Sequence, residues 1–235
     1  MALEPTRQAR DAPAGQGMTP RFRIETFTLG PFETNCYLVY ADTPDTRGQP
    51  CWIVDASFGP AEMIERTREL GLRPTALLLT HAHVDHIAGV DEVCAAFPGL
   101  PVLVHGAERE WLGNPALNLS LGAGVRITAR GPDGMLEDGQ ELELEGGRWR
   151  VLHTPGHSPG GVTFFSEAQR VALVGDALFA GSVGRTDFPG SDPDLLARSI
   201  GTRLYSLPDD TVIYPGHGPQ STIGREKRTN PFVRA

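Results

Sequence analysis

Long apolar runs are missing from the 235-residue chain, and their absence excludes the simplest membrane architecture. No stretch of about 18 consecutive apolar residues occurs, so we expect no transmembrane helix and no membrane partner. Residues 1–20 carry two arginines but lack the apolar segment of a secretory signal peptide. The sequence therefore predicts a cytoplasmic protein.

Cysteine and positive charge are also scarce. Cys36, Cys51 and Cys94 are odd in number and lack zinc-ribbon spacing, so we expect free thiols in a reducing compartment. The 21 Lys and Arg residues are outnumbered by 29 Asp and Glu, which gives a net charge of −8. Because an acidic chain repels phosphate backbones, the composition argues against a nucleic-acid partner.

The chain does contain enough apolar sequence for one folded domain. Hydrophobic residues make up 40% of it, which excludes a wholly disordered protein, and the length fits a single domain. Residues 1–20 contain proline and glycine but no aromatic or β-branched apolar residue. We therefore expect a disordered tail over 1–20 and a domain over 21–235, with Met18 as an alternative start of translation.

Apolar patterning predicts alternating strands and helices in the first half of the domain and mostly strands in the second. The expected strands are 22–29, 36–40, 51–55, 75–80, 101–105, 141–145, 148–153, 161–166, 170–175 and 211–215. The expected helices are 60–70, 86–96 and 193–204. Residues 113–135 are expected to form a loop over the site. The alternation indicates α/β layering.

Four potential metal ligands follow the apolar strand over 75–80, within the segment HAHVDH. Clustered histidines repel one another once protonated, so they gain nothing from proximity unless a divalent metal neutralises the site. His81 and His83 alternate at a strand end, where they point the same way and can share one ion. Asp85 and His86 are displaced toward a second ion.

Three later segments also place a ligand-type side chain at the end of a predicted strand, each beside glycine. They are PGHSPG with His157, VGDA with Asp176, and YPGHG with His217. Glycine lets the backbone approach closely and adopt a positive φ. A catalytic metal needs such ligands from distant loops together with an open position for water.

These four motifs, in this order, resemble the metallo-β-lactamase superfamily over about residues 22–232. The resemblance implies an αβ/βα sandwich, an α/β fold of four layers with two mixed sheets flanked by helices. It implies two metal ions, one bound by His81, His83 and His157 and the other by Asp85, His86 and His217, with Asp176 bridging them.

Two further residues are weaker candidates for supporting the ligands. Asp55 matches a position that supports the metal-ligand loop in the family that the chain resembles. His153 lies four residues before His157, where it either supports a ligand or is an ordinary solvated or core histidine. We assign His105 a structural role.

A pair of divalent ions roughly 3.5–4 Å apart can hold a hydroxide at neutral pH, which predicts metal-assisted hydrolysis. Asp85 and Asp176 are the candidate catalytic carboxylates. Zinc is the expected metal, while iron and manganese remain alternatives because imidazole and carboxylate sites accept all three.

The segment FAGSVGRTDF and the C-terminal NPF resemble the glyoxalase II-like branch, in its short single-domain form. That resemblance implies a small-molecule partner, a glutathione thioester such as S-lactoylglutathione. Arg185 is the candidate for binding a substrate carboxylate, with an internal pair to Asp187 as the alternative. Full-length glyoxalase II carries a C-terminal helical extension, whereas only 18 residues follow His217 here, and at this point the chain departs from that resemblance.

Other functions remain open at this point. The GRTDF segment also resembles persulfide dioxygenases, which carry a single iron on one early histidine, His157 and Asp176. Another hydrolase of the same fold, such as a β-lactamase or a lactonase, is a further alternative. A metal-binding module without catalysis is disfavoured because no ligand of the set is missing. The oligomeric state stays open.

Overall fold

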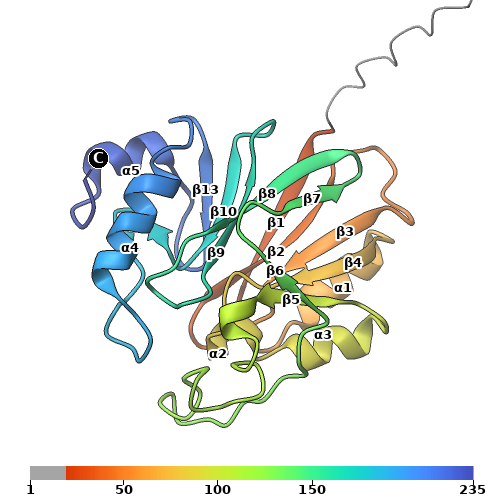
Figure 1. Ribbon diagram of the computed structural model, residues 1–235. Helices are drawn as coiled ribbons and strands as arrows, with labels where there is room; N and C mark the ends of the chain where they lie inside the picture. The colour runs from red at the N-terminus through yellow and green to blue at the C-terminus, as the bar shows by residue number, and fades with distance from the viewer. Residues whose placement is uncertain (1–19, 235) are drawn as a thin grey trace, which may run out of the picture.

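A computed structural model describes residues 20–234, so the predicted tail over 1–20 lies outside the described residues except for Pro20. Two six-stranded sheets form the centre of the molecule, as Figure 1 shows. The first contains β1 (Phe22–Leu29), β2 (Thr34–Ala41), β3 (Pro50–Val54), β4 (Arg73–Leu78), β5 (Val102–His105) and β6 (Gly134–Leu136), in that order. The second has the order β14 (Ser221–Thr222), β13 (Val212–Pro215), β10 (Val171–Gly175), β9 (Val162–Ser166), β8 (Gly147–His153) and β7 (Glu141–Leu144).

Helices cover the outer faces of both sheets. Three helices lie on the side of the first sheet: α1 (Ala61–Glu69), α2 (Val84–Ile87) and α3 (Val90–Ala96). Two helices lie on the side of the second sheet: α4 (Pro193–Ser199) and α5 (Ile223–Thr229) (Figure 1). The structure also contains a short ribbon of β11 (Leu178–Phe179) and β12 (Ser182–Val183) and a 3₁₀ turn over Gly106–Glu108. The predicted αβ/βα sandwich is confirmed.

Strand β2 shows why four layers form, because both of its faces are buried. Leu38 and Tyr40 belong to the core between the first sheet and its helices α1 and α3. Tyr37 and Val39 belong to the core between the two sheets. This alternation is the period of a strand covered on both sides. Trp52 and Trp149 meet between the sheets with ring centroids 5.8 Å apart.

The sequence missed or simplified several elements. The expected helix 86–96 is two helices, α2 and α3, separated at Gly89. A Cβ at Gly89 would overlap the carbonyl oxygen of Ser57, so only glycine allows this close approach. The expected helix 193–204 is α4 followed by a wider π turn over Ile200–Leu204, with Tyr205 N–H donating to Ile200 O at 2.8 Å. The expected loop 113–135 ends in strand β6.

Parallel strand pairs bring the candidate site residues to one edge. Strands β3 and β4 are parallel, as are β10 and β13, so the residues after each pair lie side by side. Asp55 follows β3 and the HAHVDH segment follows β4, while Asp176 follows β10 and His217 follows β13. The site therefore lies where the strand ends of both sheets meet.

Candidate metal centre

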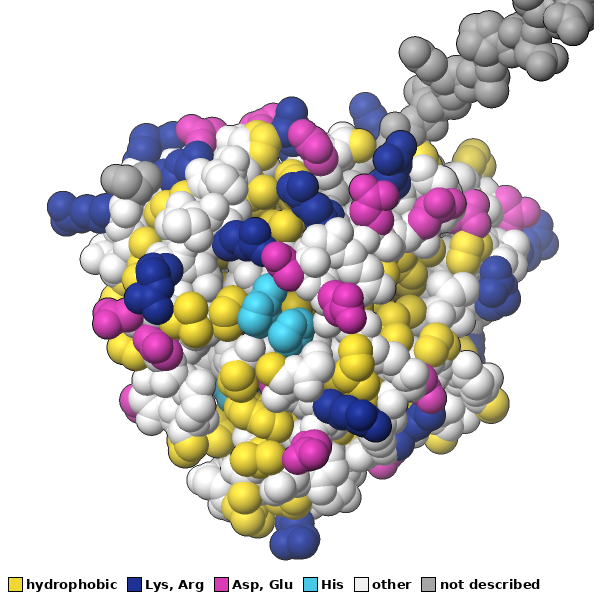
Figure 2. Space-filling model, in the orientation of Figure 1, with side chains coloured by type: hydrophobic (Ala, Val, Ile, Leu, Met, Phe, Trp, Pro, Cys, Tyr) yellow, Lys and Arg dark blue, Asp and Glu magenta, His cyan; other side chains and the backbone are white. Residues whose placement is uncertain are grey.

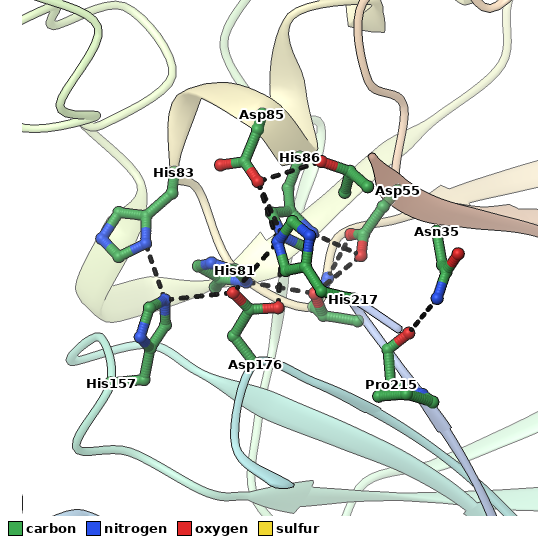
Figure 3. Close-up of polar contacts among 12 residues, drawn as sticks. Asn35, Asp55, His81, His83, Asp85, His86, His157, Asp176, Pro215 and His217 are labelled. Atoms are coloured by element: carbon green, nitrogen blue, oxygen red, sulfur yellow. Dashed lines mark hydrogen bonds and ion pairs between the residues drawn. The ribbon is translucent and has the colours of Figure 1, made fainter. Parts of the chain in front are cut away.

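Seven predicted ligands come together at this edge, in three overlapping groups whose ligand atoms lie within 4.8 Å of one another. The groups are His81 with His83 and His157, His81 with His86 and Asp176, and Asp85 with His86 and His217. Figure 3 shows His83 and His157 on one side of Asp176, and His86 and His217 on the other. All seven residues that the sequence singled out as ligands are thus brought together.

The first group is buried, and a backbone carbonyl orients one of its rings. Nδ1 of His83 lies 2.9 Å from Nε2 of His157. The Nδ1–H of His157 donates to the carbonyl oxygen of Arg185 at 2.7 Å, which leaves Nε2 with a lone pair aimed at the site. Burial lowers the pKa of His83 to about 3 and that of His81 well below its usual value. These imidazoles are therefore neutral, the form that binds metals.

The second group combines a carboxylate with two imidazoles. Nε2 of His217 lies 3.1 Å from Oδ2 of Asp85, and Nε2 of His86 lies 3.5 Å from the same oxygen. Burial lowers the pKa of His217, but hydrogen bonds to Asp176 and Asp85 outweigh it and raise the pKa to about 9. The Nδ1–H of His217 donates to Phe32 O at 3.1 Å, which turns the Nε2 edge of the ring inward.

The carboxylate of Asp176 lies between the two groups. Its Oδ2 is 3.6 Å from Nε2 of His157 and 3.4 Å from Nε2 of His217, and its Oδ1 is 3.4 Å from Nε2 of His86. A Cβ at position 216 would overlap Oδ1 of Asp176, which explains the glycine before His217. One carboxylate thus reaches both halves of the site.

The residues present fit divalent metal ions. Buried polar atoms are normally hydrogen-bonded. Nε2 of His81, Nε2 of His86 and Oδ1 of Asp176 are nonetheless buried without a hydrogen-bond partner in the described structure. Nitrogen and oxygen donors in this combination suit zinc, iron or manganese.

Asp55 orients one of these ligands from behind. Its Oδ2 accepts from Nδ1–H of His86 at 2.9 Å and from the hydroxyl of Thr80 at 2.7 Å, and its Oδ1 accepts from Thr80 N–H at 2.8 Å. The residue adopts a φ of 60°, a strained conformation for a non-glycine residue. A carboxylate behind a histidine fixes its tautomer and presents Nε2 to the metal.

Glu108 supports the site in a way that the sequence did not reveal. Its fully buried carboxylate accepts from Ala82 N–H at 2.5 Å and from Gly160 N–H at 2.7 Å. One acceptor pair thus joins the HAHVDH turn of the first sheet to the PGHSPG turn of the second. Burial raises the pKa of Glu108, and the hydrogen bonds act against that rise. The sequence did contain one signal for this role, since Glu108 is a carboxylate just past β5, at the same sheet edge as the ligands.

His153 contacts none of the seven ligands. Its Nε2–H donates to the carbonyl oxygen of Pro159 at 2.9 Å, and its ring stacks on His105 at a centroid distance of 4.1 Å. It holds the turn that carries His157 rather than the ligand itself. His105, which was expected to have a structural role, takes part in this stacked pair.

Arg185 lies at the mouth of the site, but its charge is already paired. Its guanidinium makes two hydrogen bonds to Asp187, at 2.9 and 2.7 Å, and packs over the ring of Phe188 at 4.4 Å. The side chains of Arg185 and Asp187 are each 67% exposed. The internal pair is therefore present, while the backbone oxygen of Arg185 orients His157.

A cavity of about 630 Å³ opens over the metal ligands. Its walls come from the loops after β1 and β4, the long loop between β5 and β6, strand β11 and the loop after β12. Beyond the metal ligands and Arg185, its lining is apolar: Phe32, Val84, Ala116, Leu119, Gly122, Ala123, Phe179, Phe188 and Pro189. Such a cavity above a reactive centre is typical of a small-molecule site.

Comparison with known proteins agrees with this geometry. The profile of the Metallo-beta-lactamase superfamily matches residues 29–217, and the chain belongs to that superfamily. It is 36% identical over 214 residues to the hydroxyacylglutathione hydrolase GloC of Haemophilus influenzae, covering 90% of this chain and 98% of the relative.

Two solved structures are similar to the chain, each at 40% identity. The BLEG-1 B3 metallo-beta-lactamase has a TM-score of 0.85 and covers 91% of this chain and 100% of its own. TTHA1623 in a di-iron-bound form has a TM-score of 0.77 and covers 89% of this chain and 100% of its own. The chain is thus a metallo-hydrolase of that superfamily, and its His and Asp cluster has the donors that could hold divalent metal. Within residues 20–234, no helix has the length and apolarity needed to cross a membrane.

Proposed function

We propose that this metallo-hydrolase binds two metal ions and cleaves thioesters, with glutathione thioesters such as S-lactoylglutathione as the substrate class. The observation that carries the dinuclear proposal is the Asp176 carboxylate, which reaches His157 on one side and His86 and His217 on the other. The name of the relative GloC supports the choice of substrate. Zinc and a cytoplasmic location belong to the same proposal.

In this proposal the ligands divide between two ions. His81, His83 and His157 would hold one ion, Asp85, His86 and His217 the other, and Asp176 both. Bound there, the two ions would supply Lewis-acid stabilisation of a carbonyl oxygen and a lowered pKa for a water molecule. The chain itself supplies the imidazoles that would hold the ions and two carboxylates, Asp85 and Asp176, that can accept the proton of an attacking water.

The protein also fixes these carboxylates in place. Oδ2 of Asp85 accepts from the hydroxyl of Thr34 at 3.0 Å, a buried residue at the start of β2. No serine or cysteine nucleophile is required, because the substrate bond C–S is broken by water, and the thiol leaves with a proton.

The first test is metal content, measured by plasma mass spectrometry on purified untagged protein. We expect two ions per chain, lost together with S-lactoylglutathione hydrolysis on chelation and regained on adding zinc. One iron per chain, with oxygen uptake on glutathione persulfide, would instead favour the persulfide dioxygenase alternative.

A second candidate, β-lactam hydrolysis, is favoured by the 40% identity to the BLEG-1 structure. A β-lactam carbonyl needs the same attacking water as a thioester carbonyl. The two functions are separated by comparing kcat/KM for nitrocefin and for S-lactoylglutathione on the same zinc-loaded preparation. A higher value for nitrocefin would overturn the thioesterase assignment.

A further inference from the structure

Beyond its metal ligands, the active-site cavity offers almost no charge. Among the described residues that line it, Arg185 is the one Lys or Arg, and Asp187 already neutralises it. A glutathione moiety carries two carboxylates and one ammonium group, so this lining gives it little electrostatic recognition. The binding energy for a substrate must therefore come largely from apolar contact.

Leu119 contributes to this apolar wall from an unusual backbone conformation. Its φ is 67°, in the left-handed region that a branched side chain rarely adopts. Its side chain is half-buried and lines the cavity. Such a conformation persists only where neighbouring contacts impose it, and it is frequent at ligand sites.

Buried Asn118 imposes that conformation. Its Nδ2–H₂ donates to the carbonyl oxygens of Trp111 and Ile127, both at 3.1 Å, and its Oδ1 accepts from Ser120 N–H at 3.0 Å. These bonds close the loop on both sides of Leu119.

The same asparagine fastens the loop to the metal centre. Its carbonyl oxygen accepts from Val84 N–H at 2.8 Å, between the ligands His83 and Asp85. The turn that precedes this loop also contacts the metal centre, since the ring of Trp111 stacks on His83 with centroids 5.7 Å apart. The loop is therefore in fixed register with the ligands, and Leu119 is placed over them rather than left to solvent.

We propose that Leu119 and the phenylalanines of this cavity select the acyl group of the substrate, and that the enzyme prefers straight apolar acyl chains longer than lactoyl. The inference rests on the proposed thioesterase function and specifies its substrate class. Each buried methylene adds binding energy in such a cavity, whereas the walls apart from the metal ligands and the paired Arg185 offer the lactoyl hydroxyl no polar partner. Val84, Phe179 and Phe188 are among the other residues that supply apolar contact.

The test is a series of S-acyl glutathiones, from acetyl through butyryl to hexanoyl, with S-lactoylglutathione alongside. Zinc-loaded protein should show a kcat/KM for hexanoyl about tenfold or more above that for acetyl, and above that for lactoyl. A flat series, or a preference for lactoyl, would overturn the inference while leaving the thioesterase intact. No turnover of any member would overturn the proposed function and this inference with it.

Two variants at position 119 assign the preference to its side chain. Glycine and asparagine both accept a positive φ, so Leu119→Gly and Leu119→Asn avoid the strain and should unfold at no lower urea concentration than wild type. Both should reduce the hexanoyl-to-acetyl ratio several-fold. The matched control is Leu121→Ala, since Leu121 is 51% exposed on the same loop and outside the cavity lining. A ratio that changes equally in Leu121→Ala, or in none of the variants, would refute the role of Leu119.

Discussion

At the residue scale, the residues that cluster at the site were predictable and the groups that position them were not. The HAHVDH segment, His157, Asp176 and His217 stand in glycine-flanked motifs at predicted strand ends, so residue type and position together indicated a metal. Glu108 stands in no such motif. Its role depends on two backbone N–H groups, at Ala82 and Gly160, that only the tertiary structure brings to it.

Replacing the carboxylate of Asp176 tests the shared ligand. We expect Asp176→Asn, which keeps the volume but loses the negative charge, to reduce kcat/KM about a thousandfold or more and to reduce the metal content. Circular dichroism should stay that of wild type, because the side chain lies at the site and not in a core cluster. The exposed Asp45→Asn is the control. Full activity in a metal-depleted Asp176→Asn would contradict the metal mechanism.

Replacing Glu108 tests whether it positions the ligand turns. Glutamine offers one carbonyl oxygen to two N–H donors, so Glu108→Gln must leave one of them facing an NH₂ group. We expect zinc affinity to fall about 10- to 100-fold, measured by competition with a chromophoric chelator, and kcat to fall more than KM changes. The exposed Glu110→Gln should match wild type. If stability falls while zinc affinity is unchanged, Glu108 is only structural.

At the element scale, long periodic segments were placed correctly and short ones were missed. Strands such as β2 and β9 have a continuous apolar core pattern, and their predicted bounds differ from the structure by no more than two residues. The strands β11, β12 and β14 have two residues each, too few for any period. Helix α5 was not among the expected helices, although Thr222 caps it by accepting from Arg225 N–H.

The junction of α2 and α3 provides a test at this scale. We expect Gly89→Ala to lower the free energy of unfolding by about 1–3 kcal/mol, because the added methyl overlaps Ser57 O and contacts Pro60. The added methyl would displace the loop that contains Ser57 and Asp55. Because Asp55 orients His86, zinc affinity should fall as well. Urea unfolding measures the first effect. Gly113→Ala, where a Cβ meets nothing within 4 Å, should change stability little, and equal stability of the two variants would contradict the packing argument.

At the scale of the whole molecule, ion pairs link the layers across long sequence separations. Glu25 on β1 accepts from the guanidinium of Arg66 on α1 at 2.9 and 3.2 Å, and from the hydroxyl of Tyr40. The Arg66 hydrogen bond lowers the pKa of Glu25, burial acts against it, and Tyr40 adds to the lowering. The charged carboxylate is therefore favoured in the folded chain.

The sign of the pH dependence follows from that lowered pKa. The stabilisation from Glu25 is present above the ordinary glutamate pKa of about 4.3 and is lost as pH falls through the lower folded value. Because the pair is partly exposed, we expect wild type to exceed Glu25→Gln by no more than about 1 kcal/mol at pH 7. The difference should shrink below about pH 4 in urea titrations at each pH. A constant difference from pH 7 to pH 3 would contradict the ion pair.

The sequence by itself determined the ligand types, the strand ends that carry them and the layered α/β class, because each depends on local composition and period. The order of the strands in the two sheets, the Glu108 link and the placing of Leu119 over the ligands were decided only by the tertiary structure. Each of these depends on contacts between segments far apart in the chain, and local pattern carries no information about which distant backbone groups will meet.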